Sequence, residues 1–275
     1  MAGIGGGGGN RLALGTKCYS GGTLGAAMDG TWFWIAAVVA AMLVGMGKGG
    51  LPVVGMLGVP VLSLVMSPVA AAGLLLPVYI VSDAFGLYAY RQAFDRRVVA
   101  IMAAGGTLGV GFGWATASVV PEDAVTLLVG LIGLVFALNL LIRRKVAAAK
   151  AAKLGPGLFW GMLTGFTSFV SHAGAPPYQV YVQPLGLGKA MFAGTTTVLF
   201  AYINAIKLVP YFALGQINAG SLKAAAVLAV PAAIAVFAGV KLVTILPEAL
   251  FFRLVTWALL LISIKLIRDG VMGLI

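Results

Sequence analysis

The chain has 275 residues, of which 61% are hydrophobic and 9% are charged, and its mean hydropathy is +1.07. Because about 25% of the residues in an average soluble domain are charged, this composition excludes such a domain and predicts an all-α polytopic membrane protein in a lipid bilayer. The net charge of +11 does not indicate nucleic acid as a partner, since the basic residues stand mainly where apolar runs end and so act as topology signals.

Residues 1–30 are expected to form a disordered tail. They contain a run of glycines, and the apolar stretch at 12–14 is too short for the core of a signal peptide. The alternative is that they are an upstream extension and that the native product starts at Met28. The single cysteine of the chain, Cys18, excludes an internal disulfide framework and a thiolate metal cluster.

The first apolar segment is interrupted by a glycine-rich stretch with one lysine, Gly45-Met46-Gly47-Lys48-Gly49-Gly50-Leu51-Pro52. The apolar arms on either side, at 32–47 and 51–66, are each shorter than the ~20 residues that a helix needs to cross a bilayer. Glycines allow the backbone to leave helical geometry, and a cation at membrane depth indicates that something polar is bound there. We therefore predict that this stretch forms half of a transport site.

Three spans are predicted to follow, at 69–90, 98–120 and 124–142. The loop at 91–97 carries three arginines, and the linker after 142 is rich in Lys and Arg, so the positive-inside rule places both in the cytoplasm. Two spans separate these basic segments, which is the parity that this placement requires.

The second half of the chain repeats the pattern of the first. The motif Lys48-x-Gly50-x-Pro52 returns as His172-x-Gly174-x-Pro176, shifted by 124 residues. We predict two inverted pseudo-repeats, each a broken or re-entrant helix pair followed by three transmembrane helices. The spans of the second half are expected at 190–214, 222–240 and 250–267. The predicted division is a tail at 1–30, a first repeat at 31–144, a basic cytoplasmic linker at 145–156 and a second repeat at 157–275.

These motifs resemble those of the sulfite exporter TauE/SafE family. The resemblance covers roughly residues 32–268 and rests on the glycines of 45–50, on Pro60, on the basic linker and on Gly188-Lys189-Ala190 leading to Gly194-Thr195-Thr196-Thr197. It implies a secondary transporter, expected to be an exporter, of sulfite, thiosulfate or small organosulfonate anions across the cell inner membrane, without a cofactor. Lys48 and His172 depart from the family's glycine-richer motif and would adapt the site to one substrate. The direction of transport, the coupling ion and the oligomeric state stay open.

Lys48 is the leading candidate for anion binding. Its charge would pair with an oxyanion, helped by the N–H groups of Gly49 and Gly50 and by the positive N-terminal end of the helix that starts near Pro52. The alternative is a tight surface turn with the lysine in water. Ionisable groups inside a membrane are usually functional, which favours the binding role.

Two further ionisable residues are candidates for binding or proton coupling. His172 would bind the anion or change charge near neutral pH, and the alternative is a neutral histidine bonded to a carbonyl. Asp83 lies well inside an apolar run, where a carboxylate is costly unless it is paired or hydrated. It would carry the coupling proton or hold Lys48 or Lys207 in an ion pair, and the alternative is a purely structural ion pair.

The span at 190–214 contains more polar residues. Asn204 is expected to face the site opposite Asp83, although hydrogen bonding between helices would explain it equally well. Lys207 is expected near the end of this span and would extend to the membrane interface. The threonines at 195–197 and the glycines at 105–113 are interpreted as packing residues, the latter in preference to a nucleotide-binding loop.

A membrane-embedded enzyme and an anion channel are the alternatives to a transporter. One buried carboxylate and one histidine do not make a catalytic or metal-binding constellation, so no catalytic residue and no metal site is predicted. A channel is harder to exclude, because broken helices also line pores. The predicted coupling residues are Asp83 and His172, and the predicted substrate-binding residues are Gly47, Lys48, Gly49, Gly50, Pro52, His172, Gly174, Pro176, Gln179 and Asn204.

Overall fold

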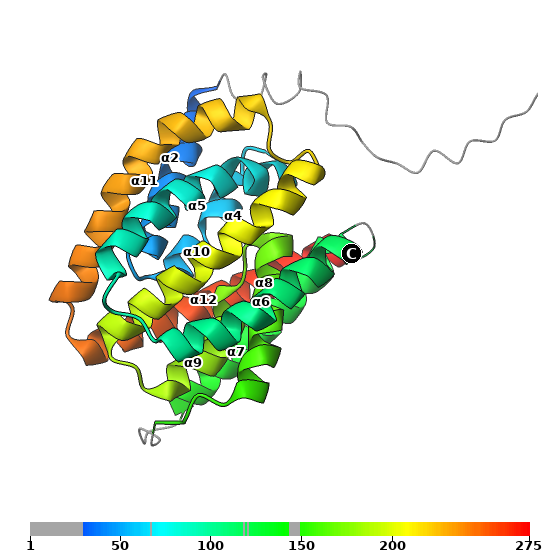
Figure 1. Ribbon diagram of the computed structural model, residues 1–275. Coiled ribbons are helices and arrows are strands. Elements are labelled where there is room, and N and C mark those ends of the chain that lie inside the picture. Colours follow the sequence, from blue (N-terminus) through cyan, green and yellow to red (C-terminus); the bar gives the residue numbers. More distant parts are fainter. Residues whose placement is uncertain (1–29, 67, 118, 120, 143–148) are drawn as a thin grey trace, which may run out of the picture.

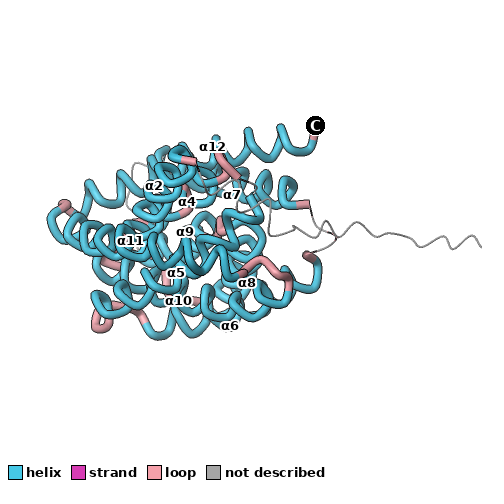
Figure 2. Tube along the Cα trace, turned by 90° about the horizontal axis from the view of Figure 1, so that it is seen from above, coloured by secondary structure: helices cyan, strands magenta, loops and turns pink. Residues whose placement is uncertain are grey.

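The computed structural model of the protein describes residues 30–66, 68–117, 119, 121–142 and 149–275. Every regular element in these residues is a helix, as Figures 1 and 2 show, which confirms the predicted all-α membrane fold. The predicted tail at 1–30, except Gly30, lies outside the described residues, and so do three basic residues that follow position 142, Arg143, Arg144 and Lys145. Within the described residues, six helices are long and apolar enough to cross a membrane: Thr31–Lys48, Val69–Tyr90, Arg96–Thr116, Lys189–Ala213, Ala219–Ile245 and Glu248–Leu274.

The two halves of the chain contain the same elements in the same order. The first half consists of α2 (Thr31–Lys48), α3 (Pro52–Gly55), α4 (Gly58–Leu62), α5 (Pro68–Tyr90), α6 (Arg96–Thr116) and α7 (Glu122–Ile142). The second consists of α8 (Leu154–Ser171), α9 (Ala175–Val182), the 3-10 turn η1 (Gln183–Leu185), α10 (Lys189–Ala213), α11 (Ala219–Ile245) and α12 (Glu248–Leu274). Each half is thus a broken helix pair followed by three long helices.

Several helix boundaries differ from the predicted ones for local reasons. The arm predicted at 51–66 is two short helices, because Pro60 lacks the N–H that would donate to the carbonyl of Met56. Helix α6 starts earlier than predicted because a carboxylate oxygen of Asp95 accepts the N–H of Val98 at 2.9 Å. Helix α11 is longer than predicted, and a reciprocal cap between Asn218 and Ser221 fixes its start.

Both broken segments return to the end of the molecule from which they enter. Gly58 of α4 lies against Ala40 and Val44 of α2, so α4 runs back along α2. In the second half, the N–H of Lys150 donates to the carbonyl of Pro184 at 3.0 Å, which brings the end of the broken segment back beside its start. Re-entrance of the two segments into a membrane stays a prediction, which this geometry favours.

Glycines set the closest helix contacts. A Cβ atom on Gly109 of α6 would lie 1.9 Å from the carbonyl oxygen of Met162 on α8, and one on Gly105 would lie 2.3 Å from that of Leu158. The equivalent pair, α2 and α11, packs in the same way, since a Cβ on Gly45 would lie 2.1 Å from the oxygen of Ala232. Figure 1 shows both pairs side by side. The interpretation of the glycines at 105–113 as packing residues is confirmed for these two positions.

Equivalent helices of the two halves run in opposite directions where they meet. Along α5 and α10, Gly73 contacts Gln216 whereas Gly86 contacts Thr197, so the two helices are antiparallel. Helices α7 and α12 are also antiparallel, because Gly130 of α7 contacts Ile267 of α12 whereas Gly133 contacts Leu259. An inverted orientation of the repeats relative to a membrane stays a prediction, which this pairing favours.

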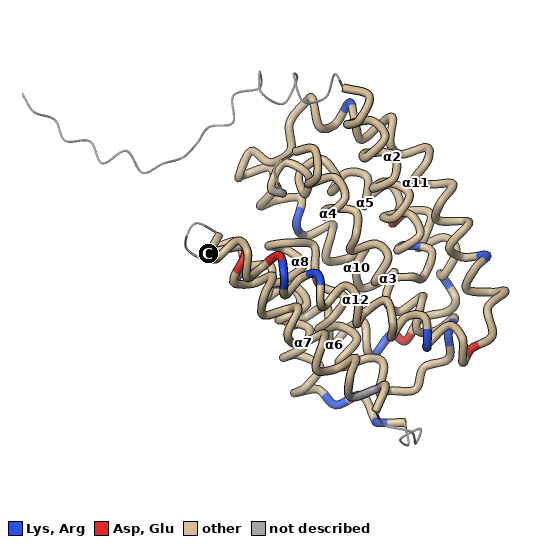
Figure 3. The backbone as a smooth tube through the Cα atoms, turned by 180° about the vertical axis from the view of Figure 1, so that it is seen from behind, with Lys and Arg blue, Asp and Glu red and all other residues tan. Residues whose placement is uncertain are grey.

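Most charged positions lie at the ends of helices, as Figure 3 shows. Among the described residues, three charged side chains are instead buried inside the bundle: Lys48, Asp83 and Lys207. All three lie where the two breaks meet α5 and α10. A buried charge is costly unless it is paired, so this region is the candidate site.

Candidate functional site

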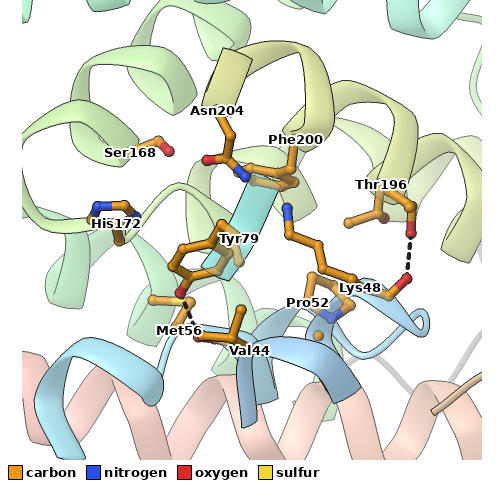
Figure 4. A pocket seen from close by; sticks show the side chains of 14 residues that line it. Val44, Lys48, Pro52, Met56, Tyr79, Ser168, His172, Thr196, Phe200 and Asn204 are labelled. Carbon is orange, nitrogen blue, oxygen red and sulfur yellow. Dashed lines mark hydrogen bonds between the residues drawn. The ribbon is translucent and has the colours of Figure 1, made fainter. Parts of the chain in front are cut away.

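A small cavity of about 40 Å³ lies between the two helix breaks. It has room for a few water molecules or one small polyatomic anion. Both halves of the chain contribute to its wall, through the end of α2, the starts of α3 and α9, the end of α8 and the facing sides of α5 and α10 (Figure 4). The lining residues are Val44, Gly47, Lys48, Pro52, Gly55, Met56, Tyr79, Ser168, His172, Ala175, Thr196, Thr197, Phe200 and Asn204.

The first break is closed by its own backbone. The N–H of Gly49 donates to the carbonyl of Gly45 at 2.9 Å, and that of Gly50 donates to Gly47 at 3.2 Å. Gly50 has φ = 110°, and a Cβ there would lie 2.7 Å from the hydroxyl of Tyr90, so only glycine fits this turn. Gly47, Lys48 and Pro52 line the cavity, whereas Gly49 and Gly50 do not, and their N–H groups are already bonded.

Lys48 forms a buried ion pair with Asp83. Its ammonium nitrogen lies 2.7 Å from Oδ1 of Asp83, and the side-chain amide of Asn204 donates to Oδ2 at 2.8 Å. The predicted pairing of Asp83 with Lys48, and the predicted position of Asn204 opposite Asp83, are both found. The ammonium also lies 5.2 Å from the ring centre of Tyr79 and 5.8 Å from that of Phe200, within reach of cation–π attraction. Figure 4 shows the side chains of Lys48, Asn204, Tyr79 and Phe200 converging on the cavity.

His172 forms the second polar group of the site. Its backbone is left-handed (φ = 55°) at the end of α8, and its ring stacks on Tyr79 with 5.1 Å between centres. Nδ1 lies 3.3 Å from the ammonium of Lys207, and Nε2 lies 3.0 Å from the hydroxyl of Tyr211. An ammonium can only donate, so Nδ1 must accept and the proton sits on Nε2. The hydroxyl of Tyr211 in turn donates to the carbonyl of Phe169 at 2.9 Å, which completes a chain that suits a neutral His172.

Lys207 does not extend to the membrane interface, so that interpretation is wrong. Its side chain is 0% exposed, and its ammonium donates to the carbonyl of Ser168 at 2.9 Å and lies 3.2 Å from the Ser168 hydroxyl. The end of α8 packs against α10 at this point and encloses the lysine. Lys207 therefore stands directly behind Ser168 and His172, two residues that line the cavity.

Three predicted binding residues lie behind the cavity wall. Gly174 permits close packing, because a Cβ there would lie 2.8 Å from the ring of Phe200. Pro176 lies against α7, near the position where a Cβ on Gly133 would be. Gln179 is fully buried, and neither atom of its amide has a hydrogen-bond partner. None of the three lines the cavity in this structure.

The threonines of α10 combine packing with hydrogen bonding. The hydroxyl of Thr197 donates to the carbonyl of Lys48 at 3.0 Å, which ties the first break to α10. The hydroxyl of Thr196 contacts that of Tyr178 at 2.7 Å. Both side chains line the cavity, and both hydroxyls are already bonded within the protein.

A second, larger cavity of about 190 Å³ begins on the other side of Tyr211. Val69, Gly113, Thr116 and Gln216 contribute to its wall, so it lies where α5 starts and where α6 and α10 end. Tyr211 lines this cavity, and its hydroxyl contacts His172, which lines the central one. The side chain of Tyr211 thus lies between the two spaces.

A protein-family model described as sulfite exporter TauE/SafE matches residues 32–266. The chain belongs to the TauE/SafE family. It is therefore a multi-pass membrane protein of an exporter-type transporter family, and the resemblance seen in its glycine motifs is confirmed. No curated protein and no solved structure matches the chain.

In this TauE/SafE protein, sequence reasoning missed three aromatic residues of the site: Tyr79, Phe200 and Tyr211. A signal for each was present, because Tyr79 precedes Asp83 by four residues, Phe200 precedes Asn204 by four and Tyr211 follows Lys207 by four. Residues four apart share one face of a helix. Within the part of the chain that the structure describes, no three His, Cys, Asp or Glu side chains group as metal ligands.

Proposed function

We propose that this TauE/SafE protein is a secondary transporter that binds a small sulfur oxyanion, of the sulfite or thiosulfate class, between its two helix breaks. Export across the cytoplasmic membrane is the direction that we expect. The observation that carries the proposal is the cavity between the two breaks with the ammonium of Lys48 at its wall, 5% exposed and inside the bundle. Ionisable groups held at such depth mark substrate pathways.

The groups at the cavity wall suit an oxyanion. Lys48 and Asn204 supply N–H donors, and both currently donate to Asp83. An incoming oxyanion would compete with this carboxylate for the same two donors. Asp83 would then act as an internal substitute for the substrate, which keeps the empty site neutralised and is displaced or protonated when the anion binds.

The size of the cavity limits the substrate. At about 40 Å³ it accommodates a few heavy atoms, so sulfite fits better than a sulfonate with a long chain, which would require expansion. The aromatic rings of Tyr79 and Phe200 beside Lys48 provide an apolar boundary on one side of the anion.

The arrangement of the breaks favours a transporter over a channel. Helix breaks from both halves meet at one small cavity, and Tyr211 lies between it and the larger space beyond. In inverted-repeat transporters, one repeat rocks against the other around a central site. We propose the same movement here, with the antiparallel pair α5 and α10 between the halves.

The test is the thermal stability of the purified protein with sulfite, thiosulfate, sulfate, taurine and acetate, followed by flux into proteoliposomes. A ligand at a hundred times its Kd stabilises the folded state by about 2.7 kcal/mol. We expect a shift with sulfite that is lost in Lys48→Gln and kept in Lys223→Gln, a matched change at an exposed lysine. The absence of a shift with every sulfur anion would overturn the proposal, and ohmic current without saturation would replace the transporter by a channel.

A further inference from the structure

The buried charges around the cavity do not cancel. Of the residues that the structure describes, the charged side chains buried there are Lys48, Asp83 and Lys207, with exposed fractions of 5%, 3% and 0%. His172 is neutral in the hydrogen-bonded chain described above, because its Nδ1 accepts from Lys207. With both lysines protonated, two ammonium groups and one carboxylate leave a single positive charge.

The positive charge without a counterion belongs to Lys207. Its contacts are the carbonyl and hydroxyl of Ser168 and Nδ1 of His172, all of them uncharged groups. Asp83 cannot serve both lysines in this arrangement, because Lys48 holds one of its oxygens and Asn204 the other. An ammonium in low dielectric without a counterion is unfavourable, and an anion in the adjoining cavity would offset it.

We propose that the site takes its substrate as a monoanion, and that a dianion such as sulfite binds only together with one proton. This inference rests on the proposed function and specifies the charge state of its substrate. The proton either joins the anion, so that sulfite is held as hydrogensulfite, or joins the carboxylate of Asp83. In both cases the charges of the occupied site sum to zero.

Asp83 is the protein group best placed to accept that proton. The titratable groups facing it are Lys48 on α2, Lys207 on α10 and Tyr79 on its own helix, with His172 stacked behind Tyr79. The two lysines already carry their protons, and a proton on His172 would place a second cation 3.3 Å from the ammonium of Lys207, so Asp83 is the group that takes the proton when a dianion arrives. Helix α11 also packs on α5, but its lysines, Lys223 and Lys241, are exposed.

The experiment is isothermal titration of the full-length protein in detergent, in two buffers of different ionisation enthalpy, at an alkaline pH where sulfite is a dianion. The difference between the buffers gives the number of protons taken up per anion bound. We expect one proton per sulfite. Methanesulfonate, a monoanion at every accessible pH, should bind with no proton uptake.

Two variants sharpen the test. Asp83→Asn raises the net buried charge to +2, so sulfite should bind as a dianion without proton uptake. The ratio of the affinity for sulfite to that for methanesulfonate should rise at least tenfold over its value in the unaltered protein. Should this variant fail to fold, the proton counts of the unaltered protein with sulfite and with methanesulfonate decide the proposal. Lys207→Met, in which the buried charges sum to zero, should weaken the binding of both anions at least tenfold.

The outcomes separate this inference from the function on which it rests. Sulfite that binds the unaltered protein as a dianion, with no proton uptake, would overturn the charge-balance proposal and leave the anion transporter in place. If neither sulfite nor methanesulfonate binds, the proposed function itself is wrong.

Discussion

Asp83 and Lys207 occupy the same position in the two halves of the chain. Each lies 35 residues after the residue at its helix break and contacts it: Asp83 pairs with Lys48 at 2.7 Å, and Lys207 lies 3.3 Å from Nδ1 of His172. The two halves thus build the same pair of positions with different chemistry. One pair is an ion pair, and the other joins a cation to a neutral ring.

The ion pair of Lys48 and Asp83 should behave as a unit in stability measurements. Removing one partner leaves a buried charge unpaired, so Lys48→Met and Asp83→Leu should each destabilise the protein by about 3–5 kcal/mol. The double variant should be less destabilised than the sum, because neither charge is left behind. Chemical denaturation in detergent, followed by circular dichroism, measures the cycle, and additive single effects would show that the pair contributes no coupling.

Lys207 should be required for anion binding although it does not line the cavity. In Lys207→Met the buried charges sum to zero. The apparent affinity for sulfite, measured from the thermal stabilisation by the ligand, should therefore fall at least tenfold, which corresponds to about 1.4 kcal/mol of binding free energy. Lys223→Met changes the net charge of the protein equally at an exposed site and should leave binding unchanged. Equal effects of the two changes would contradict a local role for Lys207.

Tyr211 should control the passage between the two cavities. Tyr211→Ala removes the ring that separates them, so proteoliposomes should leak sulfite at zero gradient of any coupling ion. Tyr211→Phe keeps the ring and loses only the hydroxyl contacts, which should cost about 0.5–1.5 kcal/mol of stability without a leak. A leak of the same size in both variants would assign the effect to the hydrogen bonds and not to the ring.

Two glycines of α6 provide a test of helix packing with a built-in control. A Cβ on Gly109 would lie 1.9 Å from the oxygen of Met162, so Gly109→Ala must push α6 away from α8 and should destabilise the protein by ~2 kcal/mol or more. Gly111 has nothing within 4 Å, and Gly111→Ala should stabilise the helix by about 0.5–1 kcal/mol. Melting temperatures in detergent compare them, and a tolerated Gly109→Ala would contradict the close approach of these helices.

The residues of the site that the sequence predicted correctly are those whose polarity differs from that of their neighbours in the chain. Lys48 and Asp83 stand out because a charge is rare in an apolar run, and the repeat placed His172 opposite Lys48. Their pairing was predicted because a charge that is buried without a partner is costly. The order of helices followed from the same repeat.

The part that the sequence did not predict depends on contacts between segments far apart in the chain. Lys207 has the sequence context of an interfacial lysine, and only the packing of α8 against α10 shows that Ser168 and His172 enclose it. Gly49 and Gly50 were predicted to bind the anion, but their N–H groups complete the end of α2, which is a matter of local turn geometry. The donor groups of a helix end cannot be assigned to ligand or backbone before that geometry is known.

The unequal pairs at equivalent positions have a consequence for the resting state of the empty protein. If the two repeats exchange conformations during transport, identical halves would make the inward-open and outward-open states equal in energy. Here one half contains an ion pair and the other a cation against a neutral imidazole, so opening one side costs a different free energy from opening the other. We expect the unloaded protein to favour one orientation, and this built-in bias would set which face of the membrane collects substrate first.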